Sequence, residues 1–220
     1  IIWLCGFPTP TPFYLIALFL LITAWPIHRL CRHKPKAEFS RGGSPFLFIR
    51  KAPTFASACI VAGGVDLALI SLVPAMVARS PDAEPVLALS LVPAMALGTM
   101  LLQYPIAIIA DRYRLRKVNI IMATTGLSLC SLIPFFLNSI VKAIGIAFLG
   151  AGLVYGLYSI GLAMLSKRFA GGEIIAANAG FVIIFEAANL MGPGIAGVLL
   201  DMKIRLGLKI FMISIGVFYL

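Results

Sequence analysis

The sequence predicts an all-α membrane protein that crosses the bilayer several times. Hydrophobic residues make up 61% of its 220 residues and charged residues only 12%, whereas soluble domains are about 45–50% apolar and about 25% charged. Several runs reach the roughly 20 apolar residues that a helix needs to cross a bilayer. The formal net charge of +10 comes from basic residues clustered between these runs, which indicates inner-side loops and no nucleic-acid partner.

The residue types that usually carry chemistry argue against several other classes. The four cysteines have neither metal-like spacing nor the pattern of a disulfide framework: Cys5, Cys31, Cys59 and Cys130. The two histidines, His28 and His33, both fall in or beside one basic segment. The chain also has no glycine-rich loop with a lysine that would bind ATP phosphates. We therefore expect no metal site, no cofactor and no catalytic residues, so the chain is not predicted to be an enzyme.

The first segment, residues 1–28, reads as the end of a helical bundle. Ile1–Gly6 resembles the tail of a span, and residues 7–12 form a proline-punctuated turn because proline resists helix continuation. Phe13–Ile27 is a short predicted span, with Trp25 at the position of an interfacial aromatic residue. The chain begins without Met inside one apolar run and ends inside another, so we expect a fragment of a longer protein.

The second segment, residues 29–51, is the longest polar stretch and is predicted to be a cytoplasmic linker. It carries seven basic residues and one acid, Glu38. Gly42, Gly43, Ser44 and Pro45 give it the composition of a flexible linker. By the positive-inside rule this segment faces the cytoplasm and separates two bundles.

The third segment, residues 52–220, is predicted to be a transmembrane bundle. Its apolar runs cover 54–77, 86–110, 118–137, 142–165 and 174–200, and an incomplete run covers 208–220. Short turns join them, so we expect consecutive spans to be antiparallel neighbours. The loops assigned to the cytoplasm hold thirteen of the 18 basic residues, which supports this orientation.

One turn in this bundle carries a recognisable motif. Residues 103–117 read QYPIAIIADRYRLRK, an apolar helix that stops at Asp111 and runs into a basic turn. Ala107, Asp111, Arg112, Arg116 and Lys117 resemble the G-x-L-A-D-R-x-G-R-K-R signature of the major facilitator superfamily. That signature occupies the cytoplasmic turn after the second span of each six-helix half. Here Ala107 and Arg114 replace two glycines; alanine still permits close helix approach, and Arg114 suggests a turn that needs no left-handed glycine.

A second motif strengthens the resemblance. Gly192-Pro193 and Gly197, within residues 189–197, are similar to the G-P-x-x-G pattern on the penultimate span of such halves. With the helix count and the basic linker, the resemblance covers nearly the whole chain. It implies the tail of span five, span six and the C-terminal six-helix bundle of spans seven to twelve, the last one truncated.

The resemblance also implies a gate. A carboxylate at a cytoplasmic helix end can accept hydrogen bonds from the first amides of a neighbouring helix, where the macrodipole favours an anion. In such transporters Asp111 and the basic residues would latch the inner side closed. The implied partner of Asp111 is the start of span five, in the N-terminal half of the same protein. The alternative is that these charges only fix the orientation.

Two acids, Asp66 and Glu186, are the only carboxylates inside apolar runs. A charge within the membrane is costly, so such an acid is a functional-site candidate. Asn178, Glu186 and Asn189 share one stripe of a predicted helix, which we expect to face a central cavity. Burial favours the neutral form of a carboxyl group, so either acid could couple proton movement to transport. A structural hydrogen bond between helices is the alternative.

Further polar and small residues complete the candidates. Gln103, with Thr99 one turn earlier, forms a polar strip that suits either solute contact or helix packing. Tyr155 lies in a glycine-rich span and is a candidate to line the cavity. In that span, Gly152 and Gly156 have the spacing that permits close helix packing.

Together these features predict a secondary transporter that moves a small solute by alternating access, with a proton gradient as the first choice of driving force. The expected surroundings are a lipid bilayer, specifically a bacterial inner membrane. Two rival classes stay open: a polytopic enzyme acting on lipids, and a non-transporting sensor or assembly protein. An enzyme of this kind places a nucleophile, a base and metal ligands at the membrane edge, and the sequence shows none.

Overall fold

The structure is a computed structural model that describes residues 14, 17–18, 20–22, 24–26, 47–81, 83–202 and 204–219. The chain divides into two compact units, residues 1–40 and 41–220. In the first unit every described residue is helical, and all of them fall within the predicted span Phe13–Ile27. The predictions for Ile1–Gly6, the proline-punctuated turn and most of the basic linker lie outside the described residues.

The second unit consists of helices in the part of the chain that is described. They are α2 (Leu47–Lys51), α3 (Pro53–Ala78), α4 (Pro85–Arg112), α5 (Leu115–Leu132), a 3-10 turn η1 (Ile133–Phe135), α6 (Ile140–Arg168), α7 (Gly172–Met202) and α8 (Ile204–Tyr219). Helices α3 to α7 are long and apolar enough to cross a membrane, and α8 contains a shorter apolar stretch. The predicted all-α multi-span architecture is confirmed.

Proline and glycine mark where these helices begin and turn. Helix α3 starts at Pro53. The first N–H groups of a helix have no partner within the helix, so a proline, which has no N–H group, costs nothing at this position. Inside the helices, Pro74, Pro93 and Pro105 do not end α3 or α4, as neighbouring groups in a bundle can satisfy the freed carbonyls. Gly171 joins α6 to α7 with a φ of 57°, a conformation that glycine adopts without steric cost.

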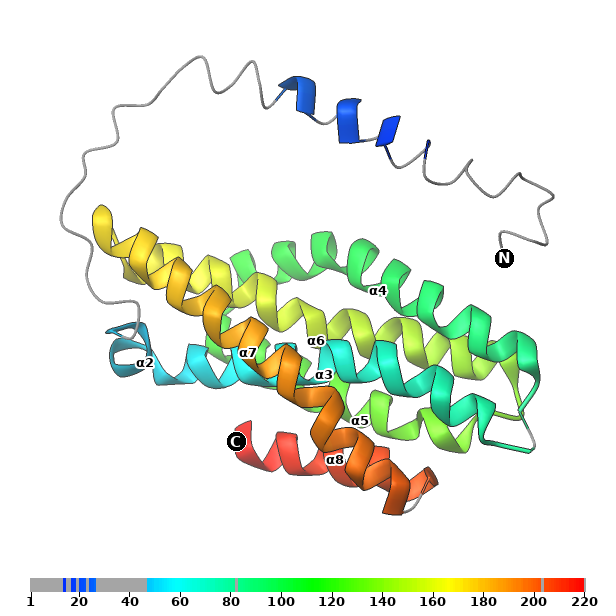
Figure 1. Cartoon of the computed structure of the whole chain (residues 1–220). Coiled ribbons are helices and arrows are strands. Elements are labelled where there is room, and N and C mark those ends of the chain that lie inside the picture. The colour runs from blue at the N-terminus through cyan, green and yellow to red at the C-terminus, as the bar shows by residue number, and fades with distance from the viewer. Residues whose placement is uncertain are drawn as a thin grey trace. The chain divides into compact units, whose positions relative to one another are not determined.

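Helices α3 and α6 form the centre of the second unit (Figure 1). Helix α6 packs mainly against α4 and α5, while α3 packs mainly against α7 and contacts α8. Helices α3 and α6 also contact each other, α3 contacts α4, and α5 contacts α8. Lipid tails are as apolar as these side chains, so close van der Waals packing holds such a bundle together rather than the hydrophobic effect.

The packing between helices adds to what the sequence predicted. Consecutive helices of the bundle contact one another, as the short turns indicated, but the most extensive contacts join α4 to α6 and α3 to α7. The reason is glycine, which lets backbones approach closely. A Cβ atom at Gly98 of α4 would overlap the Phe148 carbonyl of α6, and one at Gly152 would lie 2.6 Å from the Gly98 carbonyl oxygen.

Helices α3 and α7 run parallel in one fixed register. Four hydrogen-bonded pairs link α7 to the segment from the end of α2 to the residue after α3. They are Lys51–Glu173, Cys59–Phe181, Leu67–Asn189 and Arg79–Asp201. In every pair the residues are 122 positions apart. A constant offset over this length requires parallel helices, so the two ends of α3 meet the matching ends of α7.

Two ion pairs hold the ends of this helix pair. Lys51 Nζ lies 3.0 Å from Glu173 Oε1 at one end, and Arg79 Nη1 lies 2.7 Å from Asp201 Oδ1 at the other. Both pairs are well exposed to solvent, so each contributes at most about 1 kcal/mol. They join turns that the charge pattern had assigned to the same side of the membrane.

Candidate functional site

A small cavity opens between α3, α4 and α6. Asp66 lies midway along α3 and is half-buried, and it lines this cavity together with Thr99 of α4 and Tyr155 of α6. The cavity has a volume of about 190 Å³, and Leu69, Met95 and other apolar residues form the rest of its wall. Two of the predicted candidates, Asp66 and Tyr155, therefore share one site.

Glu186 reaches the same region from α7. Residues 122 positions apart lie side by side on α3 and α7, which sets Glu186 level with Gly64 and about 3 Å along the axis from Asp66. Tyr155 lines the cavity with Asp66, and its stacking partner Tyr158 contacts Phe185, the residue before Glu186. The fold thus brings both acids found inside the apolar runs to nearly the same level of the bundle.

Aromatic rings form one wall beside these acids. Tyr155 and Tyr158 of α6 stack with ring centroids 5.6 Å apart. Tyr158 then meets Phe185 edge-on at 4.8 Å and Phe181 at 5.1 Å, both on α7. Such pairs add about 0.5–1.5 kcal/mol each beyond their buried area. They fix α6 against α7 beside the cavity, and no sequence pattern pointed to Phe181 or Phe185.

The remaining polar candidates lie in different places. The Oδ1 atom of Asn189 accepts a hydrogen bond from the Leu67 amide at 3.2 Å, so this side chain joins α7 to α3. Asn178 and Glu186 are exposed, while Gln103 is half-buried one turn beyond Thr99 and outside the cavity lining. The expected stripe of Asn178, Glu186 and Asn189 therefore includes one residue that packs against a neighbouring helix.

The gating motif is more helical than the sequence suggested. Helix α4 continues through Asp111 to Arg112, and α5 already begins at Leu115. The predicted basic turn therefore shrinks to Tyr113 and Arg114, and Arg116 and Lys117 lie in the first turn of α5. Arg114 has a φ of −63°, so the turn needs no left-handed glycine, as its sequence indicated. Ala107 and Asp111 are both exposed.

The glycines of the two packing motifs differ in how closely atoms of neighbouring helices approach them. A Cβ atom at Gly152 would lie 2.5 Å from Leu102 Cδ1, and one at Gly156 would lie 2.6 Å from Ile106 Cδ1. At Gly192 it would overlap the Gly64 carbonyl, whereas at Gly197 its nearest neighbour is Leu72 Cδ2 at 3.9 Å. Pro193 is half-buried within α7. Gly192 is therefore the tight position of its motif.

This difference yields a stability prediction for α7. Gly192→Ala should destabilise the intact protein by about 1–3 kcal/mol because its methyl group meets the α3 backbone. Gly197→Ala should change stability by less than about 0.5 kcal/mol, since ordinary contact distance remains. The midpoint of thermal unfolding of the detergent-purified protein measures both effects. Equal midpoints for the two variants would contradict the observed packing.

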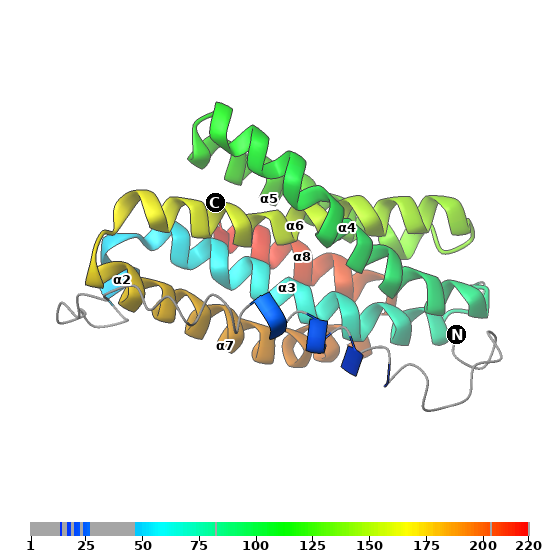
Figure 2. The same ribbon diagram turned by 90° about the horizontal axis from the view of Figure 1, so that it is seen from above.

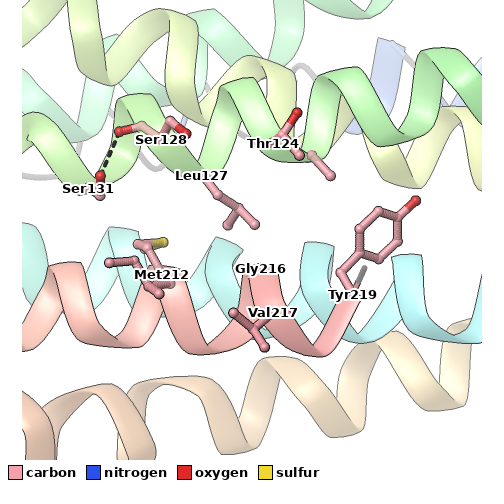
Figure 3. A pocket seen from close by; sticks show the side chains of 10 residues that line it. Thr124, Leu127, Ser128, Ser131, Met212, Gly216, Val217 and Tyr219 are labelled. Carbon is pink, nitrogen blue, oxygen red and sulfur yellow. Dashed lines mark hydrogen bonds between the residues drawn. The ribbon is translucent and has the colours of Figure 1, made fainter.

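A second cavity, of about 220 Å³, lies between α5 and α8. Thr124, Ser128 and Ser131 of α5 line it together with Met212 and Tyr219 of α8, and Figure 3 shows Leu127 of α5 pointing toward α8. The hydroxyls of Thr124 and Ser131 donate to carbonyls of their own helix. Such local bonds satisfy polar groups in a membrane helix, so these hydroxyls are explained without a ligand.

These features define an α-helical, multi-pass membrane protein with a partly polar cavity among its central helices. The sequence is 27% identical over 186 residues to the uncharacterized MFS-type transporter YfkF of Bacillus subtilis (strain 168), and the alignment covers 82% of this chain. The chain spans 45% of the length of that relative. Its sequence and its helices are consistent with the C-terminal half of a major facilitator transporter. No protein-family model matches the chain, and no solved structure matches it.

Proposed function

We propose that this chain forms the C-terminal half of a secondary transporter that moves a small solute across a bacterial inner membrane by alternating access. The observation that carries the proposal is the convergence of Asp66, Thr99 and Tyr155 from three helices on one cavity, with Glu186 on a fourth helix at the level of Gly64. Transporter sites characteristically lie near the bilayer midplane between two rocking bundles. Asp66 and Glu186 lie near the middle of their helices, as such a site requires.

The two acids are proposed to carry the coupling proton. The two ion pairs found within the described residues involve Lys51 and Arg79 at the helix ends, so neither Asp66 nor Glu186 is neutralised by a base in that part of the chain. An acid within the membrane that no base neutralises is costly, which makes both side chains candidates for a functional role. A proton taken up from one side and released to the other would drive solute movement.

The turn around Asp111 is proposed to form the inner gate together with the N-terminal half of the protein. Asp111 is exposed at the end of α4, next to four basic residues: Arg112, Arg114, Arg116 and Lys117. Charges arranged in this way can bind a second bundle in one conformation and release it in the other. A latch of this kind would bias the two-state equilibrium on which alternating access depends.

Alternating access can be tested before the solute is known. Thr99→Cys, placed in an otherwise cysteine-free intact protein, should react with a membrane-impermeant maleimide added to either face of the membrane, since the cavity opens to each side in turn. A variant that retains only Cys130, which is fully buried, should stay unlabelled and serves as the control. Labelling of Thr99→Cys from one face alone would contradict the proposal and favour a one-sided site.

A further inference from the structure

A large groove on this bundle lies away from the cavity just described. It runs between the end of α4 and the start of α5, with α6 beneath, and has a volume of about 540 Å³. Figure 2 shows the end of α4 that leads into α5 rising away from the other helices. The lining combines two basic residues with a long apolar wall: Arg114, Lys117, Ile109, Val118, Ile121 and Met122.

The charged end of this groove is unneutralised in the described part of the chain. Arg114 and Lys117 are both exposed, and the two ion pairs found there, Lys51–Glu173 and Arg79–Asp201, involve neither residue. The groove lining contains no acid. An anion therefore finds two available cations at this end of the groove.

The apolar end has the length of a lipid chain. Val118, Ile121 and Met122 follow Lys117 along α5, and the lining extends to Thr125. The first ten residues of α5 rise about 15 Å, which equals about half of the 30 Å hydrocarbon core of a bilayer. Ile121 is 63% exposed and Ile109 is 41% exposed, so both present apolar surface outward, whereas Val118 and Met122 are buried beneath them.

We propose that this groove binds an anionic phospholipid. Its phosphate lies between Arg114 and Lys117, and one acyl chain lies along Ile109, Val118 and Ile121. Free phosphate would leave the apolar wall uncovered, and a zwitterionic lipid would bring its own cation next to Arg114 and Lys117, which would repel it. Basic pockets between transmembrane helices are suited to anionic headgroups, at about 1 kcal/mol for each Lys or Arg near the membrane surface. A bound lipid would also brace the α4–α5 turn against α6.

The test measures lipid selectivity of the intact protein with spin-labelled lipids in proteoliposomes. Spin-labelled phosphatidylglycerol should be retained more strongly than spin-labelled phosphatidylcholine. Arg114→Gln or Lys117→Gln should reduce this preference roughly fivefold, and the double variant roughly thirtyfold. Lys142→Gln and Lys209→Gln remove basic residues that do not line the groove, so both should keep the wild-type preference.

Two further arms separate a lipid from a free anion. Ile121→Trp fills the groove without changing its charge, so it should displace the phosphatidylglycerol chain. Excess inorganic phosphate should leave retention unchanged, because it lacks an acyl chain. Equal retention of the two lipids by the wild type would overturn the proposal. So would an unchanged preference in the double variant, or displacement of the bound lipid by phosphate.

Discussion

Gly98→Leu should strongly destabilise the bundle and lower the yield of folded protein. A Cβ atom at this position would overlap the Phe148 carbonyl of α6 and lie 2.8 Å from its carbonyl carbon. A leucine adds three further carbons to this clash, and backbone atoms cannot rotate away as a side chain does. We expect a destabilisation of about 3 kcal/mol or more, a large share of the roughly 5–15 kcal/mol that stabilises a typical domain.

The measurement is the yield of monodisperse intact protein after detergent extraction, followed by its unfolding midpoint. Gly145→Leu is the matched control, because Gly145 also lies within a transmembrane helix, α6, yet has no atom within 4 Å of its added Cβ. The control should extract and unfold like the wild type. If Gly98→Leu did the same, α4 and α6 would not be in close backbone contact.

The close packing at Gly98 illustrates which parts of the fold could be predicted from the sequence and which could not. Helix positions were predictable because an apolar run must match the bilayer in length, and α3 and α6 extend the predicted spans by only a few residues at either end. The partner of each helix was not predictable, since a single glycine at Gly98 or Gly63 forms no pattern. Both become informative only when a carbonyl from another helix lies against them.

The candidate cavity shows the same division. Asp66 stood out because an acid within an apolar run is costly, and Tyr155 stood out by its place in a glycine-rich span. That these two share a cavity with Thr99 depends on how α3, α4 and α6 cross. Asn189 looked like a cavity residue on helical periodicity alone, but its hydrogen bond to the Leu67 amide depends on the register between α3 and α7.

Asp66→Asn and Glu186→Gln should each abolish accumulation of solute driven by a pH gradient, down to the level of liposomes without protein. Both changes keep the size and polarity of the side chain but remove the group that can gain and lose a proton. The assay uses the intact protein in proteoliposomes and a panel of small solutes, with a pH-sensitive dye inside. The solute whose transport by the wild-type protein changes the internal pH is then given to the variants.

A second assay separates proton coupling from solute binding. Exchange of labelled for unlabelled solute across the membrane needs no net proton movement, so both variants should retain it. Asp201→Asn and Glu173→Gln are matched controls, because these acids form exposed ion pairs at the helix ends that contribute little; both should accumulate solute normally. Normal pH-driven accumulation in both Asp66→Asn and Glu186→Gln would end the coupling proposal. Loss of exchange as well would mean that the acids bind the solute itself, since a coupling group is needed only when net protons cross.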